Sequence, residues 1–259
     1  MNINSVSYQG FLLSLIFLTY LSGCNQKEQE KSDLNILSKK EIKEGWNLLF
    51  DGKSTENWRG VFKDTMPNYG WVIMENALSV NMEYDSTAPS GGDIITIDQF
   101  GDFDLRWEWR LMNKGDNSGL KYYYKEYDEE QNRYGLGLEY QILDDGDHEW
   151  MQEGKMKPND YHTMGALYEL YPPSETKKVL PLGEWNSSRV ISNNNHVEHW
   201  LNGDKILEYE RGSDDFKEKV SASKFRDAEG FGLFSEGHIM LQDHGGALQV
   251  RNMKIKELK

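Results

Sequence analysis

One stretch of the sequence places acid–base side chains at the spacing of a strand face. It runs from Gly137 to Asp144 and reads Gly-Leu-Glu-Tyr-Gln-Ile-Leu-Asp. Side chains two positions apart share a face of a β-strand, so Glu139 and Gln141 point one way while Tyr140 enters the core. Most retaining glycosidases need two carboxylates around the sugar bond, and an amide cannot ionise. This strand therefore lacks the second carboxylate of a retaining glycosidase.

A histidine near the C-terminus is a second candidate for proton transfer. If the strand before it continues through His244, then Gln242 and His244 share a face, and an unperturbed imidazole titrates near physiological pH. A lone histidine at a strand end is more often only hydrogen-bonded, so both interpretations stay open. Glu108 is a further carboxylate, but its alternation with Arg106 and Arg110 favours ion pairing.

The spacing of the potential metal ligands does not predict a metal site. His196 and His199 are three residues apart, which places them on opposite faces of a strand. The acidic run from Asp144 to Asp147 lacks the loop spacing of an EF-hand and is better explained as a solvated turn. We therefore predict no cofactor from the spacing of these residues.

The composition excludes several other classes of function. The formal net charge of −14 disfavours a nucleic acid as partner. The sequence contains no G-x-S-x-G nucleophile elbow, phosphate loop or dinucleotide fingerprint. Serine-nucleophile and nucleotide chemistry are therefore not expected.

Strand signals dominate the chain and predict the elements that hold these residues. Apolar and polar residues alternate in the ranges 103–111 and 136–142. Asn202-Gly203 between two such runs predicts a hairpin with a type I′ turn. Further strands are expected at 231–234, 239–242 and 248–255, and long loops at 144–160, 172–173 and 212–226. Because long amphipathic helices do not alternate with the strands, we expect an all-β sandwich of two sheets, or jelly roll.

The N-terminal residues resemble an export signal. Residues 11–21 form an apolar run that is short for a transmembrane helix. The run ends in Leu21-Ser22-Gly23-Cys24, which resembles the lipobox of bacterial lipoproteins, although no Lys or Arg precedes it. Cys24 is the only cysteine, so an intrachain disulfide is impossible. We expect a cell-envelope lipoprotein on the periplasmic or cell-surface side, anchored to the outer or cytoplasmic membrane through Cys24.

Three segments follow from this interpretation. Residues 1–24 are the signal peptide with the lipidated cysteine at its end, residues 25–40 are a flexible tether, and residues 41–259 are one β-sandwich domain. Ser38 and Glu41 have the spacing of a capping box, and Gly45 follows as a terminator. A short helix is therefore expected at the start of the domain, and the oligomeric state is left open.

Seven short motifs occur in an order that resembles one known family. They are Leu49-Phe50-Asp51-Gly52 with Trp58, Asn117-Ser118-Gly119-Leu120, Glu139-Tyr140-Gln141-Ile142-Leu143-Asp144, Gly165-Ala166-Leu167-Tyr168, Gly183-Glu184-Trp185-Asn186, His199-Trp200-Leu201-Asn202-Gly203 and Leu241-Gln242-Asp243-His244-Gly245. Together they resemble the 3-keto-disaccharide hydrolase family from about residue 44 to the C-terminus.

The resemblance implies a concanavalin-A-like jelly roll that acts on glycosides oxidised to a ketone at C3. Such a ketone acidifies the hydrogen on C2, so one base removes it, the C1 substituent leaves by elimination, and water adds to the enone. Glu139 or His244 is then the base, and a divalent metal held by Glu139, Asp144 and a histidine is the alternative way to polarise the ketone. The candidate contacts to the substrate are Gln141, Lys121, Asp144, His199, Gln242 and Arg251. The alternative is a carbohydrate-binding lipoprotein module without catalysis, with aromatic stacking platforms.

Overall fold

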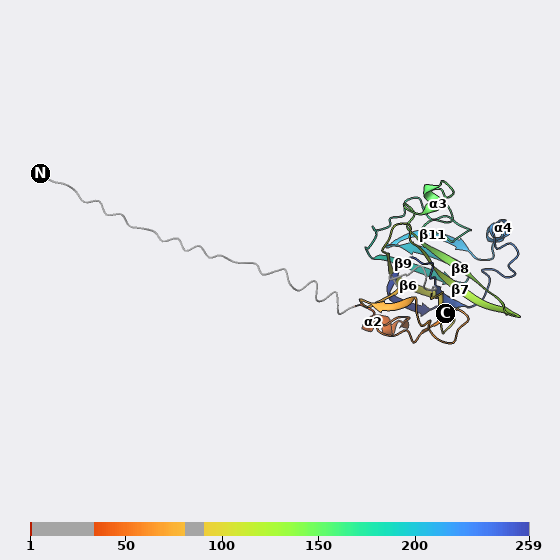
Figure 1. Ribbon diagram of the computed structural model, residues 1–259, viewed down its shortest axis with the longest axis horizontal. Coiled ribbons are helices and arrows are strands. Elements are labelled where there is room, and N and C mark those ends of the chain that lie inside the picture. The colour runs from red at the N-terminus through yellow and green to blue at the C-terminus, as the bar shows by residue number, and fades with distance from the viewer. Residues whose placement is uncertain (2–33, 81–90, 259) are drawn as a thin grey trace. The chain divides into compact units, whose positions relative to one another are not determined.

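Two antiparallel sheets pack face to face in the computed structural model, which describes Met1, residues 34–80 and residues 91–258 (Figure 1). In these residues the larger sheet has the order β11 (Asp204–Glu210), β10 (His196–Leu201), β9 (Asn186–Asn193), β6 (Phe103–Leu111), β13 (Leu248–Glu257), β4 (Ala77–Val80) and β3 (Trp71–Met74), and β1 (Trp46–Leu48) also pairs with β13. The smaller sheet has the order β2 (Trp58–Gly60), β5 (Ile94–Thr96), β12 (His238–Leu241), β7 (Asn117–Glu129) and β8 (Asn132–Leu143). The predicted all-β, two-sheet class is confirmed.

Aromatic side chains fill the space between the sheets. Trp107 and Trp109 come from β6, Tyr122 from β7 and Tyr140 from β8, and each is at most 1% exposed. The rings of Trp107 and Tyr140 meet edge to face with their centroids 5.1 Å apart. The alternation read from the sequence in 103–111 and 136–142 therefore gives the inward faces correctly, and it leaves the charged positions between them facing outward.

A chain of polar groups crosses this core. The Nε2 of His199 lies 2.8 Å from the hydroxyl of Tyr122, which lies 2.6 Å from the hydroxyl of Tyr209. The Nδ1 of His199 lies 3.0 Å from the carbonyl oxygen of Gly165. Because a carbonyl only accepts, Nδ1 donates and Nε2 accepts from Tyr122. Burial lowers the pKa of His199 to about 4, so the ring is neutral at physiological pH.

Two local predictions are confirmed in detail. Asn202 and Gly203, between β10 and β11, have φ angles of 50° and 89°, as a type I′ turn requires. The short helix α2 (Lys39–Lys43) begins with the capping box of Ser38 and Glu41. The segment after it reverses at Gly45, whose φ is 83°.

Two other local predictions are wrong. The range 212–226 holds a helix, α4 (Asp214–Ala222), which begins at the N-cap Ser213 and buries Phe216 to 1% exposure. The range 231–234 is not a strand, because its backbone turns at Gly232, whose φ is 72° and whose carbonyl oxygen accepts from Arg211. The loop 144–160 contains one further short helix, α3 (Glu149–Gln152). These helices lie at the periphery of the sheets (Figure 1).

The compact unit begins at Leu34, within the range 25–40 that we expected to be a tether. Asn35 is 2% exposed, and it exchanges two hydrogen bonds of 2.6 and 2.7 Å with Asn252 of β13. Those bonds make the residues from 34 onward part of the fold. Cys24 and the predicted signal peptide lie outside the described residues. Among the residues that are described, no helix is long and apolar enough to cross a bilayer.

Candidate active site

The outer face of the smaller sheet carries Glu139 and Gln141. In the pairing of β7 with β8, Lys121 lies opposite Glu139 and Gly119 lies opposite Gln141. Tyr140, between the two polar residues of β8, is buried in the core, so these four positions face outward. The prediction that Glu139 and Gln141 share one face of a strand is confirmed.

The Glu139 carboxylate is at the centre of this face. Its side chain is 10% exposed, and its Oε2 lies 3.5 Å from the Nζ of Lys121. With the amide of Gln141 oriented to suit its neighbours, the amide nitrogen lies 3.2 Å from the Oε1 of Glu139 and 3.1 Å from the carbonyl oxygen of Ser118. The carboxylate therefore has a cation beside one oxygen and an N–H donor beside the other, which fixes its orientation.

The absence of a side chain at Gly119 leaves the space that this carboxylate occupies. A Cβ atom at position 119 would lie 2.5 Å from the Oε1 of Glu139 and 3.1 Å from its carboxyl carbon. The φ of Gly119 is not in the left-handed region, so the backbone itself does not require glycine. The requirement is for room between the strand and the carboxylate, and it explains the glycine of the Asn-Ser-Gly-Leu motif.

The segment around Tyr168 extends the sheet beyond β8. The N–H of Tyr168 donates to the carbonyl oxygen of Glu139 at 3.1 Å, and the N–H of Gln141 donates to the carbonyl oxygen of Ala166 at 3.2 Å. Backbone bonds therefore hold β8 along both edges near Glu139. Burial raises the pKa of Tyr168 to about 12, and the charges of Glu139 and Glu169 contribute to the increase.

A second carboxyl group belongs to the same electrostatic environment. Asp93 directly precedes β5, which β12 separates from β7, and its Oδ1 accepts from the N–H of Asp243 at 2.9 Å. Burial raises the pKa of the Asp93 carboxyl. The N–H of Asp243 and the ammonium of Lys121 offset part of this increase, whereas the charges of Asp243 and Glu139 add to it.

Sequence reasoning missed Asp93. The only signal near it is Gly91-Gly92 before a short apolar run, which marks the start of a strand and no particular chemistry. Its neighbourhood depends on the order of the strands in the sheet, because Lys121 and Glu139 come from β7 and β8. A motif search along the chain therefore has no means of joining these groups.

The two candidates near the C-terminus are placed differently from each other. β12 ends at Leu241, so the condition that would align the side chains of Gln242 and His244 on one strand face is not met. The backbone N–H of Gln242 donates to the carbonyl oxygen of Gly119 at 3.0 Å, which keeps Gln242 beside the site. His244 is exposed in the irregular segment that follows.

Three of the predicted substrate contacts lie away from this face. Arg251 is on β13 in the larger sheet, and its Nε donates to the Oε2 of Glu108 at 2.7 Å. The prediction that Glu108 forms an ion pair is confirmed, but its partner is Arg251, whereas Arg106 pairs with Asp104 and Arg110 with Glu75. His199 is 0% exposed between the sheets, where its ring nitrogens bind Tyr122 and Gly165. These positions do not agree with a role of Arg251 or His199 in contacting the sugar at Glu139.

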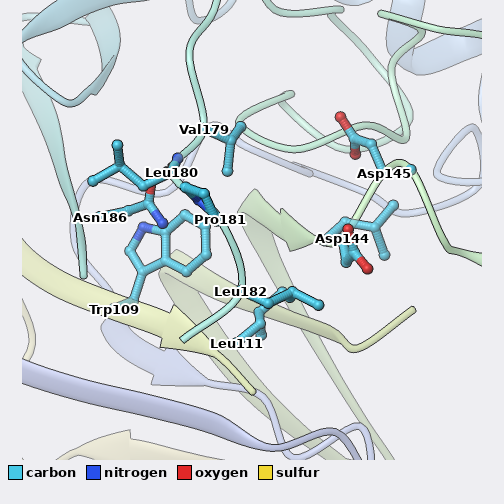
Figure 2. Close-up of a pocket in the computed structure, with 11 residues that line it drawn as sticks. Trp109, Leu111, Asp144, Asp145, Val179, Leu180, Pro181, Leu182 and Asn186 are labelled. Atoms are coloured by element: carbon cyan, nitrogen blue, oxygen red, sulfur yellow. Dashed lines mark hydrogen bonds between the residues drawn. The ribbon is translucent and has the colours of Figure 1, made fainter. Parts of the chain in front are cut away.

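Asp144, the third of these contacts, lines a separate pocket of about 250 Å³ beyond the end of β8. Asp144 and Asp145 lie on one side of it, and Trp109 lies on the other side with the segment 179–182 (Figure 2). The Oδ2 of Asp144 accepts from the N–H of Gly115 at 2.8 Å, and the Oδ2 of Asp145 accepts from Lys177 at 2.7 Å. Both carboxylates therefore accept hydrogen bonds from groups of the protein, which is typical of a structural turn.

One surface group among the described residues has the spacing of cation ligands. His196, Glu198 and Glu208 of β10 and β11 place one ligand atom each within 4.8 Å of one another. Lys205 pairs with both glutamates, and Glu210 lies 2.6 Å from the Nδ1 of His196. A lysine therefore offsets part of the negative charge of this cluster, which belongs to the larger sheet rather than to the face of Glu139.

Comparison with known proteins decides the family. The model of the 3-keto-alpha-glucoside-1,2-lyase-like domain matches residues 45–256, which covers the two sheets and the site on the smaller one. The chain belongs to this family. The resemblance read from the seven motifs is thereby confirmed, and the matched range begins where the motifs placed it.

Members of the 3-keto-alpha-glucoside-1,2-lyase-like family and related structures resemble the chain over most of its length. A 3-keto-disaccharide hydrolase of Bacteroides thetaiotaomicron is 29% identical, and the match covers 92% of this chain and 91% of that protein. A solved structure from Parabacteroides distasonis, of a protein provisionally named a glycosyl hydrolase, is 33% identical with a TM-score of 0.76 and covers 88% of this chain and 100% of that one. A second structure from the same organism is 27% identical with a TM-score of 0.60, covering 82% and 99%. The predicted jelly-roll type of sandwich is confirmed.

Proposed function

We propose that the chain cleaves 3-keto glycosides by removing the proton on C2, eliminating the C1 substituent and adding water to the enone. The observation that carries this proposal is the outward face on which Glu139 lies beside Lys121 and Gln141, within 3.5 Å of each. The family of the chain and its named hydrolase relative support the substrate class. The same two findings support glycoside cleavage over a module that only binds sugar.

The first step of this reaction needs a base and a stabilised enolate. The C3 ketone acidifies the hydrogen on C2, and the Glu139 carboxylate accepts it as the C2–H bond breaks. The electron pair moves to the C3 oxygen, where the ammonium of Lys121 stabilises the negative charge. Gln141 holds the carboxylate in place with its N–H, so the base is oriented before the substrate arrives.

The second half of the reaction restores the enzyme. The enolate re-forms the C3 carbonyl as a double bond forms between C1 and C2 and the bond from C1 to the leaving oxygen breaks. Water then adds to C1 and gives up one proton, which offsets the proton that the departing oxygen takes up, and the proton held by Glu139 returns to C2. The products are the free alcohol and a 3-keto sugar, so the net change is hydrolysis.

The test is turnover of one glycoside in two oxidation states. The purified chain is expected to release methanol from methyl 3-keto-glucoside with transient enone absorbance, and to leave methyl glucoside intact. Comparable cleavage of the unoxidised compound would instead indicate two-carboxylate hydrolysis by Glu139 and Asp93, and would overturn the proposal. Tight binding of an unoxidised oligosaccharide with no cleavage of either compound would favour the binding module.

We also propose that Cys24 is lipidated and attaches the domain to the cell envelope, on the periplasmic or the cell-surface side. The support is the sequence Leu21-Ser22-Gly23-Cys24 after an apolar run. When the chain is expressed in a bacterium supplied with labelled palmitate, the wild type is expected to take up label and to partition with membranes. Cys24→Ser is expected to do neither, and equal labelling of the two would contradict the proposal.

A further inference from the structure

Departure of the C1 oxygen requires a proton that Glu139 does not supply. An alkoxide is a strong base, and its expulsion is slow unless a positioned acid supplies a proton as the bond breaks. At this point of the proposed reaction Glu139 holds the proton taken from C2. The site therefore requires a second proton donor on the same face of the sheet.

Asp93 is placed to be that donor. Ile94 lies opposite Leu241 and Leu241 lies opposite Leu120, so the positions just beyond them, Asp93 and Gly119, lie in one row across the sheet. Glu139 reaches the space above Gly119 from β8, on one side, and Asp93 stands at the start of β5, on the other. A sugar ring above Gly119 would lie between the two carboxyl groups.

We propose that Asp93 is the general acid that protonates the departing C1 oxygen. This inference rests on the proposed function. The proton passes from the Asp93 carboxyl to the glycosidic oxygen as the bond from C1 to that oxygen breaks, and the alcohol leaves neutral. In the hydration step the Asp93 carboxylate takes a proton from the incoming water as its oxygen bonds to C1, so Asp93 ends the cycle protonated.

The charges around Asp93 suit this role. The groups that act on it are the ammonium of Lys121 and the carboxylates of Asp243 and Glu139, and its own charge acts on Tyr124. Burial raises the pKa of the Asp93 carboxyl and so increases its protonated fraction near neutral pH. The N–H of Asp243 binds Oδ1 at 2.9 Å, which orients the carboxyl group.

Tyr168 is the rival donor on this face, and two observations disfavour it. Its backbone pairs with Glu139 across the edge of β8, so it stands on the side of the base. Its pKa of about 12 makes its hydroxyl a weaker acid than a carboxyl group.

The leaving group reveals which residue supplies the proton. Asp93→Asn is expected to lower kcat on methyl 3-keto-glucoside by about 100-fold or more, because methoxide needs protonation. On 4-nitrophenyl 3-keto-glucoside the same variant is expected to lose less than about tenfold in the first-turnover release of nitrophenolate, because nitrophenolate leaves without a proton and before hydration. Both rates are measured on one preparation, so the ratio of the two rates does not depend on how much of the variant is folded.

Controls separate this inference from the function on which it rests. Asp98→Asn, an exposed residue after β5, is expected to change neither rate. Equal losses on the two substrates in Asp93→Asn, or no loss on the methyl glycoside, would overturn the acid role while leaving the proposed function standing. If Tyr168→Phe shows the leaving-group dependence instead, the acid is Tyr168. Inactivity of the wild type on both substrates would refute the proposed function and this inference with it.

Discussion

Glu139→Gln is expected to lower kcat on a 3-keto glucoside by about 10²–10⁴-fold, the range that a positioned base contributes. An amide of the same shape cannot accept the C2 proton. The loss is expected for alkyl and nitrophenyl leaving groups alike, because proton removal precedes departure of either one. KM is expected to change little, since Lys121 and Gln141 remain in place to contact the sugar.

The control for this variant is Glu108→Gln. Glu108 is also a glutamate on the outer face of a strand, but it belongs to the larger sheet and pairs with Arg251. Its loss is expected to leave kcat unchanged. His244→Ala is the companion variant, because His244 is the other base that the sequence offers. Full turnover by Glu139→Gln, together with a loss in His244→Ala, would move the base to His244.

Gly119→Ala is expected to lower kcat by about 100-fold while the protein stays folded. The new Cβ would meet the Oε1 of Glu139 at 2.5 Å, so the carboxylate must move away from the strand. A displacement of about 1 Å in a catalytic group costs on the order of 10²-fold in rate. The cost in stability is small, because the atom that moves is the end of a flexible side chain and the backbone at position 119 accepts alanine.

The matched control is Gly146→Ala. Gly146 follows β8 in the same region, its φ is not in the left-handed range, and a Cβ there would meet nothing within 4 Å. Thermal unfolding and kcat are measured for both variants. Unchanged turnover in Gly119→Ala would mean that the position of the Glu139 carboxylate does not affect the rate. That result would contradict the proposed role of Glu139 as the base.

Local patterns in the sequence determine much of this fold. The alternation in 103–111 gives the buried tryptophans of β6, and Asn202-Gly203 gives the hairpin turn, because both depend on neighbours in the sequence. The wrong prediction of a loop at α4 also follows from the local pattern. Ser213 caps that helix, but only Phe216 among its residues is buried, so its apolar pattern is too sparse to mark a helix.

The site was predictable only in part, and its members show why. Glu139 and Gln141 share a strand, so period two places them together without further information. His199 and Arg251 lie in family motifs or near them, but a linear motif does not say on which side of which sheet a residue falls. Asp93 enters the site through the order β5-β12-β7-β8. That order depends on long-range pairing that one sequence does not specify.

The backbone bonds between residues 165–168 and β8 have a consequence for the diversification of this family. Residues 144–165 leave the end of β8 and return to pair along the same strand, so both ends of this segment are fixed to the strand that carries Glu139. Longer loops cost little extra closure entropy. Insertions here can therefore change the length of this segment while the backbone pairing that holds Glu139 in place is kept.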